Sequence, residues 1–220
     1  MTVRATRPAS RQRSAKAAAS RKPARARRED PAIRRQDLLA VTLSCLAKFG
    51  PRGTTGREIC RQAGVSHGLL RHYFNNPDNL LLETYQQLCD NFLDRFETEL
   101  SPPDTDPWVA LDHFFGLQFS EEWASPDVLG AWMAFWTLVR TNEDIRLVSD
   151  SFNERLRALL AIAAARLPKK DRKLPLDDAV ALLSAVMDGL WLDFCLSPTR
   201  TSRERAIELA NVAARRFFAG

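Results

Sequence analysis

Residues 54–74 read TTGREICRQAGVSHGLLRHYF, a stretch with the pattern of two short helices joined by a tight turn. Thr55 is suited to cap a helix that runs to about residue 63, Gly64 breaks that helix, and Ser66 can cap a second one. Four apolar residues are spaced to hold the two helices together: Ile59, Ala63, Val65 and Leu70. The stretch is therefore predicted to be a helix-turn-helix.

The second of these helices has a polar outer face. Ser66, His67, Arg71 and His72 lie on it, and all of them can donate or accept hydrogen bonds. Gly68 shares this face at a cost of about 1 kcal/mol relative to alanine, which makes sense if the backbone must approach a partner closely. A helix of this size fits the major groove of DNA, with its N-terminal residues at the base edges.

Charge is distributed unevenly along the 220 residues. The net charge is +5, but residues 1–30 contain ten Lys/Arg and two acidic residues, whereas residues 76–220 contain fifteen Lys/Arg and 23 acidic residues. Residues 31–75 are also basic, with seven Lys/Arg against two acidic residues. This asymmetry indicates a polyanionic partner at the N-terminal end only.

The rest of the chain after Pro31 also predicts helices. No segment alternates apolar and polar residues cleanly, and the apolar residues recur at helical spacing. Gly50-Pro51 and residues 101–103 are clear breaks. The expected fold is all-α with nine helices, at about residues 31–49, 55–63, 66–73, 76–100, 107–119, 125–140, 142–167, 177–196 and 202–218.

The pattern T-T-x-x-x-I-C-x-x-A-G-V-S-x-G-x-L-x-x-Y-F, followed by Leu80 and Leu81, resembles the DNA-binding segment of the TetR family of bacterial regulators. The resemblance implies a cytoplasmic, nucleoid-associated homodimer. Its three N-terminal helices would bind a double-stranded DNA operator, and its six C-terminal helices would bind a small-molecule inducer and dimerise. The residues expected to contact DNA are Arg34, Thr55, Arg57, Ser66, His67, Gly68, Arg71, His72 and Tyr73.

Some positions in this segment depart from the family or leave two interpretations open. Arg71 stands where the family usually has an aromatic residue, and it can pair with guanine O6 and N7. Pro77 replaces a lysine that usually contacts phosphate, a loss for which the basic tail can compensate. For Arg34 and Arg35, phosphate contact and simple solvation are both open. Tyr73 is expected both to pack and to donate to phosphate.

Three parts are expected along the chain. Residues 1–30 are rich in Arg, Ala and Ser and lack apolar periodicity, so we expect a disordered basic tail. A transit peptide has a similar composition, but a solvated arm that adds non-specific DNA affinity agrees better with the bacterial family. Residues 31–76 are expected to form the helix-turn-helix DNA-binding domain, and residues 77–220 the ligand-binding and dimerisation domain.

Aromatic residues are concentrated in the C-terminal two-thirds, which holds all five tryptophans. For any single aromatic residue, core packing is the simpler interpretation. Together with a carboxylate, such residues can also bind an ammonium group through cation–π contacts. Asp188 is expected on a buried helix, where it would need a ligand cation, an arginine or a cap donor as partner. The predicted ligand contacts are Phe92, Phe115, Phe119, Trp132, Trp136, Asp188 and Trp191.

Two stretches of this half, AWMAFW at residues 131–136 and MDGLWL at residues 187–192, resemble the BetI-type branch of the TetR family. That branch contains choline-responsive repressors of glycine-betaine synthesis genes. The resemblance implies a repressor whose inducer is choline or another ammonium compound. A lipophilic or acidic metabolite remains an alternative inducer, because related branches sense quite different molecules. A helical adaptor that does not bind DNA remains an alternative function.

The last two helices, about residues 177–196 and 202–218, are expected to dimerise as a four-helix bundle. The first of them is apolar most of the way round and should be buried on more than one side. The small residues Ala206, Ala210 and Ala213 of the second would allow close approach to the partner. A bound ligand would change the spacing of the two DNA-binding helices, with the helix at residues 77–100 as the lever.

Several other classes of protein are not expected. No Ser/His/Asp set, nucleophile elbow or phosphate-binding loop is present, so the chain should not be an enzyme and should need no cofactor. The four cysteines and three histidines lack metal-ligand spacing, and we expect buried free thiols and no metal site. The longest uncharged run in the aromatic-rich middle, Val128 to Val139, is too short to span a bilayer, so no membrane partner is expected.

Overall fold

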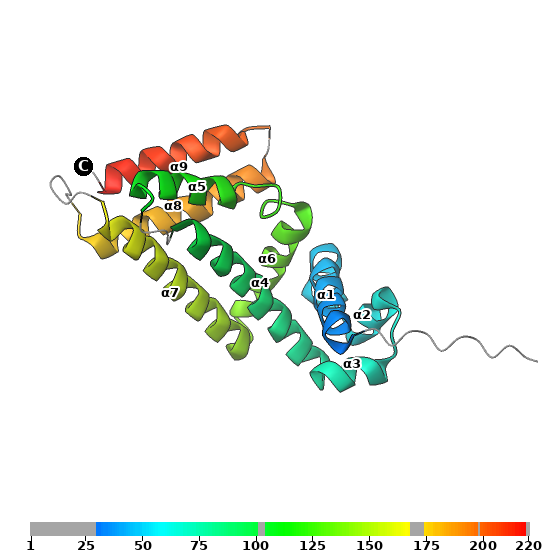
Figure 1. Cartoon of the computed structure of the whole chain (residues 1–220). Helices are drawn as coiled ribbons and strands as arrows, with labels where there is room; N and C mark the ends of the chain where they lie inside the picture. Colours follow the sequence, from blue (N-terminus) through cyan, green and yellow to red (C-terminus); the bar gives the residue numbers. More distant parts are fainter. Residues whose placement is uncertain (1–29, 101–103, 168–173, 198, 219–220) are drawn as a thin grey trace, which may run out of the picture.

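The computed structural model describes residues 30–100, 104–167, 174–197 and 199–218, and within them it contains nine helices and no strand (Figure 1). The all-α prediction is confirmed. The predicted basic tail lies outside the described residues except for Asp30, whose carboxylate caps the first helix. The helices are α1 Pro31–Gly53, α2 Gly56–Ala63, α3 His67–Phe74, α4 Pro77–Leu100, α5 Pro107–Gln118, α6 Pro126–Val139, α7 Glu143–Ala165, α8 Leu176–Leu196 and α9 Arg203–Phe218.

The predicted N-caps begin their helices. The Thr55 hydroxyl accepts a hydrogen bond from the Glu58 amide at 3.2 Å, and the Ser66 hydroxyl accepts one from the Leu69 amide at 3.2 Å. The Asn76 side chain accepts from the Asn79 amide at 2.8 Å. Each cap satisfies an amide that has no partner within its own helix, and together they fix where α2, α3 and α4 start.

The predicted break at Gly50-Pro51 is a kink followed by one more turn of α1. Gly50 has φ 65° and ψ −178°, outside the helical region, and residues 51–53 then complete the helix. The turn between α2 and α3 is tighter. Gly64 has φ 65° and ψ 31°, a left-handed conformation that glycine adopts without steric cost.

Two clusters of buried apolar side chains hold the chain together. The smaller joins α1, α2, α3 and the start of α4, and includes Leu38, Ile59, Leu70, Phe74 and Leu80. The larger contains the remaining helices and most of the aromatic residues. Helix α4 belongs to both, because Leu80 lies in the smaller cluster while Tyr85, Leu88, Phe92 and Phe96 lie in the larger. Figure 1 shows α1–α3 gathered at one end and α4 running from them into the other helices.

Helix α1 also packs directly on α6. At the crossing, a Cβ atom built on Gly130 would lie 2.8 Å from Ala47 Cα and 2.9 Å from its carbonyl oxygen. Only a glycine fits there without moving one helix, because the nearest atoms are backbone. The smaller cluster is therefore attached to the larger through α6 as well as through α4.

The buried face of α9 differs from the prediction. Ala206 and Ala210 are completely buried against their own chain, so they do not offer a free surface to a partner. The buried stripe continues through Ala214 and Phe218 rather than through Ala213, because it follows a strict four-residue spacing. Within the chain, α8 buries one face only.

The opposite face of α8 carries exposed apolar side chains, with Leu182 43% and Leu196 61% exposed. Among the described helices, α8 is the one with the length and composition of a membrane-spanning helix. Val180, Leu183 and Met187 nevertheless pack into the larger cluster, as expected of a core helix.

Candidate DNA-binding helix and ligand cavity

Helix α3 and its N-cap residue present a polar face to solvent. Ser66, His67, Gly68, Arg71 and His72 are all exposed. On the opposite side of the same helix, buried Leu70 and Phe74 attach it to the smaller cluster. The helix therefore offers a continuous polar surface on a rigid support.

Tyr73 lies between these two faces. Its side chain is half-buried against the smaller cluster, and its ring meets His72 edge-on with a centroid distance of 5.3 Å. This arrangement leaves both expected roles of Tyr73, packing and donation to phosphate, compatible with its position. The helix ends at Asn75, whose φ of 62° reverses the chain toward α4.

The remaining predicted DNA contacts lie on α1 and α2. Thr55 and Arg57, at the start of α2, are exposed, and Arg34 on α1 is half-buried. Arg35 forms an ion pair with Glu83 of α4, and its guanidinium carbon lies 5.1 Å from the centroid of the Phe74 ring. Arg35 therefore joins α1 to α3 and α4.

The first residues of α2, α3 and α4 meet at Gly56. A Cβ atom built on Gly56 would lie 2.8 Å from Pro77 Cγ and 3.8 Å from His67 Cε1. The Pro77 ring thus occupies the space in front of Gly56, and residue 56 has no room for a side chain while the proline is present. This contact places the start of α3, with His67, against the start of α4.

The outer surface of α2 carries a local ion-pair network. Glu58 accepts hydrogen bonds from Arg61 at 2.6 Å and from Gln62 at 2.8 Å. These hydrogen bonds lower the pKa of Glu58 to about 2, so the carboxylate is charged at neutral pH. Arg61 is therefore already paired on the outer surface of the helix-turn-helix.

A cavity of about 170 Å³ lies between α4, α5, α6, α7 and α8. Five predicted ligand contacts line it: Phe92, Trp132, Trp136, Asp188 and Trp191. The other lining residues, which the sequence did not single out as ligand contacts, are Tyr85, Gln118, Ser149, Phe152, Asn153 and Leu156. Tyr85 was detectable only as part of the apolar stripe of α4, and nothing in the sequence pointed to the α7 residues.

The aromatic rings around the cavity contact one another. The centroid of Trp132 lies 5.3 Å from that of Phe152, and the centroids of Trp136 and Trp191 are 6.3 Å apart. Trp191 Nε1 donates a hydrogen bond to the Trp123 carbonyl oxygen at 3.2 Å, which fixes its ring. These contacts hold the aromatic walls in place.

Asp188 differs from the prediction of a deeply buried carboxylate. It is exposed and lies at the open edge of the cavity, because α8 buries only one face. Although solvent reaches this carboxylate, partial desolvation by the surrounding protein raises its pKa, while the positive charge of Arg157 lowers it. The carboxylate therefore needs no buried partner.

Phe115 and Phe119 are not among the residues that line the cavity. Both are completely buried in the larger cluster, and the ring of Phe119 lies 5.8 Å from that of Phe194. Their neighbour Gln118 lines the cavity instead. The sequence identified an aromatic helix here but not the face that it turns toward the cavity.

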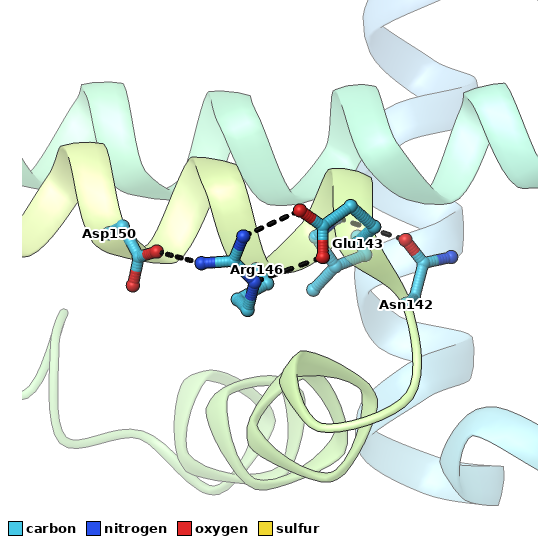
Figure 2. A network of polar contacts seen from close by, with 5 residues as sticks. Asn142, Glu143, Arg146 and Asp150 are labelled. Atoms are coloured by element: carbon cyan, nitrogen blue, oxygen red, sulfur yellow. Dashed lines mark hydrogen bonds and ion pairs between the residues drawn. The ribbon is translucent and has the colours of Figure 1, made fainter.

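The N-terminal end of α7, which supplies Ser149 and Phe152 to the cavity, is stabilised by surface contacts (Figure 2). Arg146 lies between Glu143 and Asp150, with an N–O distance of 2.5 Å to each. The Asn142 side chain caps the helix by accepting a hydrogen bond from the Ile145 amide at 3.0 Å. These contacts keep the first turns of α7 helical.

The chain matches two family models. Residues 38–84 match the bacterial regulatory proteins of the tetR family, and residues 109–219 match the C-terminal domain of the BetI-type transcriptional repressor. The HTH-type transcriptional regulator BetI of Serratia proteamaculans is 28% identical over 179 residues, which are 80% of this chain and 88% of that protein. BetI of Burkholderia mallei is also 28% identical, over 81% of this chain and 90% of that protein.

Solved structures have the same fold. A transcriptional regulator from Pseudomonas aeruginosa PAO1 superimposes with a TM-score of 0.80 at 31% identity, covering 88% of this chain and 94% of that one. A regulator from Saccharomonospora viridis in complex with choline has a TM-score of 0.71 at 21% identity, covering 82% and 95%. The chain therefore belongs to the TetR family of transcriptional regulators, carries a C-terminal domain of the BetI type, and is a regulator rather than an enzyme.

Proposed function

We propose that this regulator is a repressor that binds a near-palindromic operator as a homodimer in the bacterial cytoplasm and is released by a small ammonium compound such as choline. The observation that carries the proposal is the pairing of an exposed polar recognition helix with a separate aromatic cavity through shared helices. Each part has the chemistry that its role requires.

The DNA contacts that we propose are the nine residues predicted from the sequence. His67 and Gly68 lie in the first turn of α3, where a recognition helix meets base edges. Arg71 lies one turn further along and is exposed. Its guanidinium can donate two hydrogen bonds to guanine O6 and N7 in the major groove.

Dimerisation is proposed through the outward faces of α8 and α9. Leu182, Leu196 and Val212 are 43%, 61% and 49% exposed, which is unusual for large apolar side chains on two adjacent helices. In Figure 1 these helices lie at the end away from α3, so a dimer formed there leaves both recognition helices free. Burial of these apolar side chains would supply the association free energy.

The proposed inducer site is the cavity, with its cationic end at Asp188. Trp136 and Trp191 lie beside this carboxylate and offer aromatic faces to an ammonium group. The choline complex of the S. viridis regulator, which has the same fold, supports choline as the first compound to test. A ligand releases DNA only by binding one arrangement of the dimer more tightly, with a coupling of about 1–3 kcal/mol.

The test is fluorescence anisotropy with a labelled duplex from the region upstream of the protein's own coding sequence, titrated with and without choline. We expect a salt-dependent complex whose stoichiometry is two chains per operator and whose affinity falls with choline. Failure to bind any upstream duplex contradicts the DNA-binding proposal. Binding that responds to fatty acyl compounds but not to choline would instead favour a lipophilic inducer.

A further inference from the structure

We infer that Asn75 is a positioning residue for operator binding, because it forms a strained γ-turn that sets the angle between the recognition helix α3 and helix α4. This inference rests on the proposed role of α3 in DNA binding. It concerns a residue that lies outside the nine proposed DNA contacts and outside the residues that line the cavity.

The connection between α3 and α4 is very short. Helix α3 ends at Phe74, and α4 begins at Pro77. Only Asn75 and Asn76 lie between the two helices (Figure 1). Phe74 and Leu80, one on each helix, are 1% and 0% exposed and pack in the smaller cluster. The chain must therefore turn sharply while the helices on both sides stay anchored in the same core.

The backbone of Asn75 has the conformation of the γ-turn with positive φ. Its φ is 62° and its ψ is −50°, and the Asn76 amide donates a hydrogen bond to the Phe74 carbonyl oxygen at 2.7 Å. This turn is rare and strained for a residue with a side chain. In the described part of the chain, Asn75 is the one residue other than glycine with a positive φ. Such strain persists only where the surrounding contacts impose it.

Hydrogen bonds on both sides of Asn75 impose the turn. On the α3 side, the Asn75 amide donates to the Arg71 carbonyl oxygen at 2.9 Å and so closes the last turn of the helix. On the α4 side, the Asn76 side chain accepts a hydrogen bond from the Asn79 amide at 2.8 Å. Both helices are thus fixed up to the turn, and the backbone of Asn75 absorbs the change of direction between them.

The angle at Asn75 decides where the first residues of α3 lie. Helix α3 has eight residues, which span about 12 Å, so a rotation of about 10° at its C-terminal end moves His67 by about 2 Å. A hydrogen bond to a base edge does not survive a displacement of this size. Pro77, which follows the turn, also faces Gly56 and His67 across a narrow gap. A fixed angle at Asn75 therefore keeps His67 in register with both α4 and DNA.

The Asn75 side chain itself is exposed and makes no hydrogen bond with any residue that the structure describes. Its replacement therefore changes the backbone preference at this position and little else. Asparagine tolerates positive φ better than most residues, whereas glycine adopts it without steric cost but also samples many other conformations. Glycine at residue 75 would thus relieve the strain and at the same time loosen the angle.

The experiment measures operator affinity by fluorescence anisotropy and the melting temperature, for the full chain and for Asn75→Gly. We expect the melting temperature of Asn75→Gly to rise by about 2–4 °C, because the strain is relieved. Operator binding should nevertheless weaken about fivefold for each recognition helix, since the added freedom of glycine must be lost on DNA.

Asn91→Gly is the matched control. It is the same substitution at an exposed position inside α4, about 20 Å along the helix from the turn. It should lower the melting temperature by about 2–4 °C, because glycine is unfavourable inside a helix, and leave operator affinity unchanged. A gain in stability together with a loss of affinity is therefore expected for Asn75→Gly alone.

A purely structural role for Asn75 predicts a different result. If the turn only served the fold, Asn75→Gly would bind the operator at least as tightly as the full chain, and this outcome overturns the inference. A lower melting temperature of Asn75→Gly overturns it as well, because glycine would then relieve no strain.

A measurement without DNA separates this inference from the proposed function. Amide ¹⁵N relaxation should give order parameters near about 0.85 for α2 and α3 in the full chain, and lower values for α3 alone in Asn75→Gly. Equal order parameters of α3 in the two chains contradict the inference while DNA binding stands. If the full chain binds no upstream duplex, the DNA-binding proposal is wrong, and the relaxation of α3 still decides whether Asn75 fixes its angle.

Discussion

The crossing of α1 and α6 has no room for a methyl group at residue 130. In Gly130→Ala, the new Cβ would lie 2.8 Å from Ala47 Cα, 2.9 Å from its carbonyl oxygen and 3.0 Å from its Cβ. Two of these three atoms are backbone, so no rotation of a side chain relieves the contact. One helix must move, and the packing between α1 and α6 must loosen.

The magnitude follows from two opposing effects. Alanine in a helix interior is favoured over glycine by about 1 kcal/mol. Overpacking by one carbon in a tight contact costs about 1–3 kcal/mol, and rigid backbone neighbours favour the upper end of that range. The free energy of unfolding should therefore fall by up to about 2 kcal/mol for Gly130→Ala, the difference between these two effects.

The assay is urea unfolding of Gly130→Ala with Gly116→Ala as the matched control. Gly116 also lies within a helix, α5, which packs into the larger cluster. A Cβ atom built on Gly116 would meet only the guanidinium of Arg203, at 3.7 Å. The control should be about 0.5–1 kcal/mol more stable than the parent chain, because only the helix-propensity gain applies. If Gly130→Ala is stabilised as much as the control, the close α1–α6 crossing is wrong.

Three further predictions concern the DNA-binding end. Arg71→Ala should cost about 1–3 kcal/mol of operator affinity and relax the specificity at one base position. Anisotropy with single-base operator variants measures this loss. If the variant binds all operator variants equally more weakly, Arg71 contacts only phosphate. Gly56→Ala should lower the melting temperature because its Cβ meets Pro77 Cγ at 2.8 Å, and Pro77→Ala in the same chain should restore most of the loss. If the effects of Gly56→Ala and Pro77→Ala on the melting temperature simply add in the double variant, the contact between residues 56 and 77 is wrong. Deleting residues 1–29 removes ten Lys/Arg but keeps the Asp30 cap, and it should flatten the salt dependence of operator binding. An unchanged salt slope would show that the tail does not contact DNA.

The fold was largely predictable from the sequence because its helix boundaries depend on local chemistry. Thr55, Ser66 and Asn76 cap helices by reaching the backbone three residues on, and such signals are readable without tertiary structure. The prediction placed the end of the buried face of α9 one residue too early. Apolar residues stand at both 213–214 and 217–218, so the sequence allows two alternative buried stripes. Contact with the rest of the chain decides between them.

The aromatic cavity was less predictable than the proposed recognition helix. A recognition helix is one continuous segment, so its exposed face follows from helical spacing alone. The cavity is built from five helices, and a residue such as Phe119 can be aromatic, central in sequence and still point into the core. Polar lining residues such as Gln118 and Ser149 gave no signal, because their importance comes only from which aromatic residues surround them.

The contacts of α1 add a second connection, through α6, to the lever helix α4 that we propose between the cavity and α3. Helix α4 carries Tyr85 at the cavity and Glu83 at its ion pair with Arg35 of α1. Helix α6 carries Trp132 at the cavity and Gly130 at its crossing with α1. Both helices therefore touch the cavity and α1, and under the proposed mechanism a displacement of one relative to the other would tilt α1. Arg35 also packs on Phe74 at the end of α3, so that tilt would move α3 together with α1 as one body. Such a movement changes the distance between the two recognition helices of the proposed dimer. An operator with fixed half-site spacing would then fit the dimer less well.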